Sequence, residues 1–120
     1  MTSSPSKEFA ERYTAAWSSQ KASDVAAFFS PRGTLTVNGS AALGREAITA
    51  TAQSFMTMFP DLEVRMDVLD GNIFRWTLEG TCNGRHVRIS GHEEWIMGWD
   101  GLIAESQGHF DAEEYQRQLG

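Results

Sequence analysis

The sequence predicts an α+β fold, in which N-terminal helices close a pocket over a cone-shaped, strongly curved antiparallel sheet. The first observation is a set of three turn dipeptides, Asp70-Gly71, Asn83-Gly84 and Asp100-Gly101. Such pairs favour two-residue hairpin turns because both central residues of a type I′ turn have positive φ. The other observations are alternating apolar residues between these turns and helically spaced apolar residues before them. Together they predict helices followed by a four-stranded meander.

Two helices are expected at the start of the chain. The first extends to about residue 19, with Ser4 as its N-cap and Pro5 in the first turn, where a helix tolerates proline. The second is short, is capped by Ser23, and ends in a turn at residues 30–33 that contains proline and glycine.

A short strand at 34–38 and a third helix between Gly44 and Pro60 complete the first half. In the second half, alternation predicts that each strand has one face under the helices and one polar outer face. Opposite charges on that outer face predict a homodimer surface. The four meander strands are expected at 62–69, 73–82, 85–98 and 102–110.

Composition narrows the class of protein. The 120 residues are expected to form one domain, 1–120, and 41% hydrophobic residues are enough for a buried core. A net charge of −6 without a basic cluster argues against nucleic acid as a partner. No apolar run is long enough for a membrane span, so no membrane partner is expected. A start without a signal-peptide pattern and a lone cysteine, Cys82, predict a cytoplasmic location.

Glu93 is the residue that breaks the pattern. It occupies the apolar register of its strand, between Gly91 and Trp95. A carboxyl group buried in apolar surroundings protonates or finds a donor, and is then a candidate general acid or base. The alternative is a β-bulge at Gly91, which would turn Glu93 outward and bring in His92, Glu94 and Ile96.

Other residues are expected to face the same interior. Tyr13 lies on the buried stripe of the first helix, where its hydroxyl either donates to a developing oxyanion or is satisfied within the core. Small residues on the last strand, Ser106 and Gly108, would leave room for a cavity. Three tryptophans on inward registers would wall or fill that cavity: Trp17, Trp76 and Trp95.

The spacing of the histidines does not suggest a metal site, and no phosphate-binding loop or dinucleotide fingerprint is present in the sequence. We therefore expect neither a metal nor a cofactor.

Five segments carry a resemblance to a known family. They are F-A-E-R-Y-T-A-A-W at 9–17, A-A-F-F-S at 26–30, G-R-E-A-I at 44–48, F-P-D-L-E-V at 59–64 and G-L-I-A-E-S-Q-G-H-F-D at 101–111. In these the chain resembles the SnoaL-like family of the nuclear transport factor two-like superfamily. The resemblance implies a cone fold and relatives such as polyketide cyclases, ketosteroid isomerases and limonene epoxide hydrolases, which use acid–base chemistry without a cofactor.

Transferred residue by residue, the resemblance matches only in part. Tyr13 matches the oxyanion-donating tyrosine of the isomerases, and Glu93 falls near their protonated aspartic acid. The isomerase base would fall near Val37, and the aspartate of the cyclases and epoxide hydrolases on Gly108. The Arg-x-Asp pair of the epoxide hydrolases is also missing around residues 77–79.

These observations predict an enzyme that transfers protons on a small, mostly apolar cyclic molecule, as in isomerisation, cyclisation or a lyase step. Glu93 would be the acid–base group, Tyr13 the oxyanion donor and Asn38 a polar contact at the mouth. The alternative is a non-catalytic module for ligand binding or dimeric assembly, which the missing carboxylates favour. The expected apolar walls are Trp17, Trp76, Trp95, Phe55, Met58 and Phe110.

Overall fold

The computed structural model describes residues 4–120. Its elements follow the order α1 (Lys7–Ser18), α2 (Ala22–Ala26), β1 (Phe29–Val37), β2 (Ser40–Leu43), α3 (Gly44–Met58), β3 (Glu63–Asp70), β4 (Ile73–Cys82), β5 (Arg85–Met97), β6 (Ile103–Phe110) and α4 (Ala112–Leu119). Within this range the strands form a six-stranded sheet in the order β2-β1-β6-β5-β4-β3. The pair β1–β6 is parallel, and the other neighbours are antiparallel.

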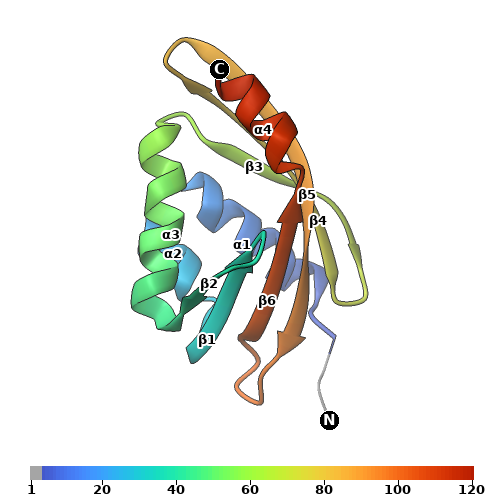
Figure 1. Cartoon of the computed structure of the whole chain (residues 1–120). Coiled ribbons are helices and arrows are strands. Elements are labelled where there is room, and N and C mark those ends of the chain that lie inside the picture. The colour runs from blue at the N-terminus through green and yellow to red at the C-terminus, as the bar shows by residue number, and fades with distance from the viewer. Residues whose placement is uncertain (1–3) are drawn as a thin grey trace.

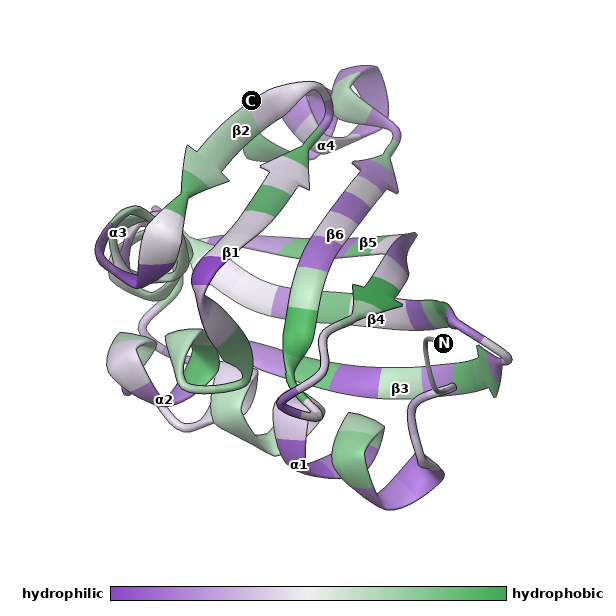
Figure 2. Ribbon diagram, turned by 90° about the horizontal axis from the view of Figure 1, so that it is seen from below, coloured by the Kyte–Doolittle hydropathy of each residue, from purple (hydrophilic) through white to green (hydrophobic). Residues whose placement is uncertain are grey.

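The sheet curves around the helices, which confirms the predicted α+β cone. Figure 1 shows α1, α2 and α3 on its concave side and α4 at one end of the long β5 strand. Register shifts in three strand pairs, among them one between Ile96 and Met97, supply the bends. Figure 2 shows alternating hydrophilic and hydrophobic bands along β3 and β4, as expected for strands with one covered face.

Within residues 4–120, no helix has the length and apolar character needed to cross a bilayer.

The three predicted turns are present, but they differ in conformation. Asn83 and Gly84 both have positive φ, 52° and 77°, as a type I′ turn requires. Asp70 instead pairs with Ile73 as a strand residue, and Gly71 alone supplies the positive φ of its turn. The third connection is longer, because β5 ends at Met97 and β6 begins only at Ile103.

Two predicted helix caps were wrong by a few residues. The first helix is capped by Ser6, whose Oγ accepts a hydrogen bond of 3.0 Å from the Phe9 amide, so neither Ser4 nor Pro5 belongs to its first turn. The second helix begins at Ala22, with Lys21 rather than Ser23 at the N-cap position.

The main differences lie in the elements that the sequence pattern did not reveal. The segment expected as a turn at 30–33 belongs to β1, because the pairing of β1 with β6 shifts there and the bulge accommodates Pro31 and Gly33. Strand β2 and helix α4 were not predicted. Helix α4 is capped by Asp111, whose Oδ1 accepts from the Glu114 amide at 3.0 Å.

Candidate functional site

Unbroken strand pairing holds Glu93 on the inner face of the sheet. The β4–β5 ladder runs without a shift from Ile73↔Glu94 to Cys82↔Arg85, so β5 has no bulge at Gly91. Glu93 is therefore only 7% exposed, whereas the neighbouring Glu94 faces solvent. Of the two registers considered for this strand, the structure has the one that buries Glu93.

Three donors from three elements surround one oxygen of the Glu93 carboxylate. Oε1 accepts hydrogen bonds from the Tyr13 hydroxyl at 3.0 Å, the Trp95 indole Nε1 at 3.0 Å and the Ser106 hydroxyl at 2.7 Å. Oε2 has a single, longer contact of 3.3 Å with the Tyr13 hydroxyl. Oε1 is thus saturated, and Oε2 is the oxygen with capacity for another partner.

Burial decides the protonation of this group. It raises the pKa of the Glu93 carboxyl above its ordinary value of 4.5, although the hydrogen bonds from Trp95, Ser106 and Tyr13 oppose the rise. Burial, reinforced by the Glu93 charge, also raises the pKa of Tyr13 well above its ordinary value. Tyr13 therefore remains a hydroxyl donor, and Glu93 is the group of this pair whose raised pKa moves toward neutral pH.

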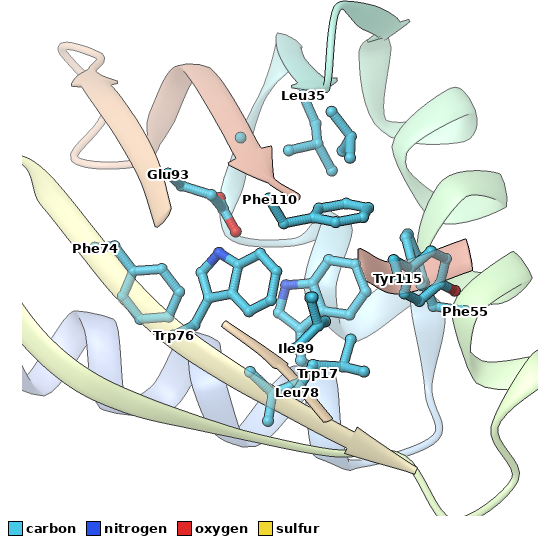
Figure 3. A pocket seen from close by; sticks show the side chains of 13 residues that line it. Trp17, Leu35, Phe55, Phe74, Trp76, Leu78, Ile89, Glu93, Phe110 and Tyr115 are labelled. Carbon is cyan, nitrogen blue, oxygen red and sulfur yellow. The ribbon is translucent and has the colours of Figure 1, made fainter. Parts of the chain in front are cut away.

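Glu93 faces a cavity of about 50 Å³ inside the cone. Figure 3 shows Glu93 and Tyr115 on opposite sides of a cluster of aromatic rings. Among the described residues that line the cavity, Glu93 is the only carboxylate, and most of the others are apolar. The lining consists of Trp17, Leu35, Val37, Phe55, Val64, Phe74, Trp76, Leu78, Ile89, Glu93, Gly108, Phe110 and Tyr115.

Six of the residues predicted for the site line this cavity: Trp17, Phe55, Trp76, Glu93, Gly108 and Phe110. Three others form a layer behind the carboxylate instead. Tyr13 and Ser106 are fully buried with their hydroxyls on Glu93, and Trp95 stacks on Phe74 at a ring distance of 5.0 Å. The Tyr13 hydroxyl, expected to meet an oxyanion, is therefore directed at Glu93.

Asn38 and Met58 lie outside the cavity wall. Asn38 occupies a turn with a positive φ of 47°, and its side-chain oxygen accepts a hydrogen bond from the Phe110 amide at 3.0 Å. Met58 ends α3 with 41% of its surface exposed, and its sulfur accepts from the Tyr115 hydroxyl at 3.3 Å. Each supports a residue that lines the cavity.

Tyr115 is the lining residue that the sequence interpretation missed. It lies on α4, which was not predicted, and packs against Phe59 and Phe110 at the end of the cone. The signal was present in the pair Asp111 and Glu114, since an aspartate followed three residues later by a glutamate is typical of a helix start.

The positions at which the resemblance expects catalytic carboxylates lie in the cavity wall without an ionisable group. Val37 and Gly108 pair directly in the parallel β1–β6 ladder, and both line the cavity. A Cβ on Gly108 would make an ordinary contact of 3.6 Å with Cγ of Glu93, and its tightest neighbour would be the Thr36 carbonyl oxygen at 3.2 Å. Thr77 bonds with Asp67 at 2.6 Å, away from the cavity lining.

Within residues 4–120, no three His, Cys, Asp or Glu side chains are grouped closely enough to hold a metal ion. His92 and His109 are neighbours, with ring centroids 5.1 Å apart, but they lie on the register opposite Glu93.

Comparison with known proteins agrees with this fold. The family model of the SnoaL-like domain matches residues 10–106. This chain belongs to the SnoaL-like family. No sequence among the curated proteins matches it.

Solved structures share the SnoaL-like fold at low sequence identity. A protein with a ketosteroid isomerase-like fold from Catenulispora acidiphila, in complex with trimethylamine, is 17% identical with a TM-score of 0.83, covering 96% of this chain and 94% of that one. A protein described as a SnoaL-like polyketide cyclase from Jannaschia is 18% identical, with a TM-score of 0.77 and coverages of 93% and 89%. TerC, co-crystallised with polyporic acid, is 15% identical, with a TM-score of 0.78 and coverages of 93% and 95%.

Proposed function

We propose that this SnoaL-like protein is a cofactor-independent acid–base enzyme that transfers a proton on a small, mostly apolar cyclic molecule. The observation that carries the proposal is Glu93: a buried carboxyl with a raised pKa, facing a mostly apolar cavity in whose described lining it is the only carboxylate. Groups with these properties are suited to general acid–base catalysis near neutral pH. Two structural neighbours with bound small molecules, trimethylamine and polyporic acid, are consistent with a ligand in the cone.

The two oxygens of Glu93 would have separate roles. Oε1 is held by Tyr13, Trp95 and Ser106, which fixes the plane of the carboxyl group. Oε2 is then free to take a proton from the ligand and to return it. Tyr13 acts in this scheme as a positioning residue, because its hydroxyl contacts Glu93 and it is not part of the cavity lining.

The size of the cavity favours small substrates. A volume of about 50 Å³ holds only a few water-sized groups, since one water needs roughly 10–15 Å³. A ring compound would enter by moving half-buried side chains at the wall, of which Phe55, Trp76 and Phe110 are the largest.

The lone Cys82 fits our expectation that the protein works in the reducing cytoplasm.

Exchange of α-protons on a small cyclic ketone tests the proposal. Cyclopentanone is incubated with the protein in D₂O, and its deuterium content is followed by NMR. Glu93→Gln keeps the shape of the side chain but removes the titratable oxygen, so we expect the exchange rate to fall by about 10²–10⁴-fold.

The matched control is Glu94→Gln, which changes the neighbouring, solvent-facing carboxylate and should leave the exchange rate unchanged. Equal rates for wild type and Glu93→Gln would reject Glu93 as the acid–base group.

A non-catalytic ligand-binding module is the second candidate. It is favoured by Val37 and Gly108, which stand where the family's known enzymes are expected to carry a second carboxylate. In that case cyclopentanone would bind without any protein-dependent exchange. Binding with exchange in wild type, but not in Glu93→Gln, would exclude this candidate.

A further inference from the structure

Two buried hydrogen-bond donors in the cavity wall have no assigned role. The indole nitrogens of Trp17 and Trp76 are both buried, and neither has a hydrogen-bond partner among the described residues. Both side chains line the cavity with Glu93, and Trp17 as a whole is only 8% exposed. A buried donor without an acceptor costs free energy, so these groups require explanation.

The position of each donor is fixed by its surroundings. Trp76 lies opposite Gly91 in the β4–β5 ladder, and its ring occupies the space above that glycine. Figure 3 shows the nitrogen of Trp76 on the side of the ring that faces Glu93. Trp17 extends from α1 and packs edge-on against Tyr13 and Phe55, with ring distances of 6.5 and 6.0 Å. Its N–H favours the ionised form of Tyr13 and so lowers the pKa of that hydroxyl, which places this donor on the Tyr13 side of the ring and leaves Trp76 as the donor that faces Glu93 (Figure 3).

The chemistry of indole limits which ligand atoms these N–H groups can bind. An indole N–H donates and cannot accept, so its partner must offer a lone pair. A cation prefers the negative face of an aromatic ring, whereas the N–H lies on the positive edge. The remaining lining side chains, apart from Glu93 and Tyr115, contain no polar group. The wall therefore suits an apolar molecule with one acceptor oxygen.

We propose that the indole N–H of Trp76, the donor that faces Glu93 (Figure 3), binds the carbonyl oxygen of a cyclic ketone ligand. This inference deepens the proposed function and rests on it. When the Glu93 carboxylate takes a proton from the carbon next to the carbonyl, the C–H electron pair forms a C=C bond. The carbonyl π pair then moves onto oxygen, and the proton returns from the Glu93 carboxyl to carbon. Preorganised donors stabilise the charge that develops on that oxygen.

This assignment gives the oxyanion a hydrogen-bond donor, a role that Tyr13 does not fill. The Tyr13 hydroxyl donates to Glu93, and Tyr13 is absent from the cavity lining. Glu93 itself cannot be both the base and the oxyanion donor in the same proton abstraction. Among the described lining residues, Trp76 supplies the nitrogen donor that faces Glu93 (Figure 3).

Three ligands of nearly equal size test the inference: cyclopentanone, methylenecyclopentane and cyclopentylamine. Binding to the full chain is followed by the indole ¹H–¹⁵N resonances, assigned by replacing each tryptophan with phenylalanine. We expect cyclopentanone to bind most tightly and to shift the Trp76 resonance downfield. The resonance of Trp99, which is 93% exposed, should not move.

The variant Trp76→Phe removes the donor and keeps an aromatic ring. The ratio of the cyclopentanone to the methylenecyclopentane affinity should fall about two- to tenfold, the equivalent of one hydrogen bond. Using the ratio cancels any change in cavity shape that affects both ligands. The matched control, Trp99→Phe, should leave the ratio unchanged.

Equal affinity for ketone and alkene, preference for the amine, failure of all three to bind, or an unchanged ratio in Trp76→Phe would each overturn the assignment. Its failure is distinct from failure of the proposed function, because Glu93→Gln tests proton exchange and should leave the ketone-induced indole shifts in place.

Discussion

The buried carboxyl of Glu93 should make the stability of the fold depend on pH. Burial raises the pKa of this group in the folded chain above its ordinary value of 4.5, so the folded state holds the proton more tightly than the unfolded state. The resulting stabilisation is complete below pH 4.5 and is lost as the pH rises through the folded-state pKa. Compared with Glu93→Gln, wild type should therefore lose unfolding free energy as the pH rises from 4 to 8.

Urea denaturation of both proteins across that pH range measures the difference. The comparison with Glu93→Gln is necessary because other carboxylates make the unfolding free energy change with pH in the opposite direction. A hydrogen bond from Arg65 lowers the pKa of Glu79, so the contribution of Glu79 to stability is lost as the pH falls. Glu94→Gln, which removes the neighbouring solvent-facing carboxylate, controls for the loss of one acidic side chain. Parallel curves for wild type and Glu93→Gln would mean that Glu93 does not have a raised pKa.

Tyr13→Phe should raise the pKa of Glu93 further. The Tyr13 hydroxyl donates to the carboxylate and so favours its charged form, whereas phenylalanine keeps the ring without the donor. The ¹³C resonance of the Glu93 carboxyl, followed through a pH titration, reports the change. Tyr115→Phe is the matched control, since that hydroxyl donates to Met58. An unchanged or lower Glu93 pKa in Tyr13→Phe would contradict the hydrogen bond.

Residue patterns could predict the position of Glu93 but not the contacts that it makes. Alternation along one strand decides which side chains share a face, and that rule placed Glu93 inward. The donor from Tyr13 is 80 residues away in sequence, and the choice of Oε1 depends on side-chain distances. No periodicity contains that information, which is why Tyr13 was expected at the cavity and is found on the carboxylate.

At the scale of elements, Gly91 is the point at which β5 makes room for Trp76. A Cβ at this position would lie 2.4 Å from the His109 carbonyl oxygen and 2.5 Å from Cζ2 of Trp76. Gly91→Ala should therefore separate β5 from β6 or displace the indole, at a cost of about 1–3 kcal/mol in unfolding free energy. Urea denaturation measures the cost, and the Trp76 indole resonance should move.

Gly71→Ala is the control for Gly91→Ala. Gly71 has a φ of 61° and nothing within 4 Å of an added Cβ, so the substitution strains the backbone without reaching Trp76. The Trp76 resonance of Gly71→Ala should match that of wild type. A wild-type resonance in Gly91→Ala as well would show that the glycine does not set the position of the indole.

The elements that sequence reasoning missed are those whose signals conflict. Pro31 and Gly33 are typical of turns, yet they lie in β1. The register shift between Phe29 and Thr34 leaves both residues outside the regular pairing with β6, so the strand can accommodate them. Helix α4 follows the last strand directly: β6 ends at Phe110, and Asp111, considered in the sequence only as the end of the segment 101–111 that carries the family resemblance, caps the helix. As a result the position of Tyr115 was missed, although the pair Asp111 and Glu114 signals the start of its helix.

At the scale of the whole molecule, local rules led to the correct class of fold but not to the full sheet. The meander β3–β6 follows from hairpin turns between neighbouring segments. The parallel pairing of β1 with β6 joins residues about 70 positions apart, from Thr34↔Glu105 to Val37↔Gly108, and no local signal encodes it. That pairing closes the cavity next to Glu93, so the site is a consequence of the complete sheet.

The outer face of the sheet leads to a last prediction, that the protein is a homodimer. This face combines apolar and titratable side chains: Ile96 is 49% exposed beside Glu105, and His92 lies against His109. A self-complementary contact there would cover Ile96 on both copies.

Sedimentation should give about twice the chain mass of 13.3 kDa. Ile96→Asp should reduce the sedimenting mass to that of the single chain, because it places like charges together at the contact. Leu43→Asp, at the exposed sheet edge on β2, should sediment like wild type. A wild-type protein that sediments as a single chain, or a dimer insensitive to Ile96→Asp, would reject this surface.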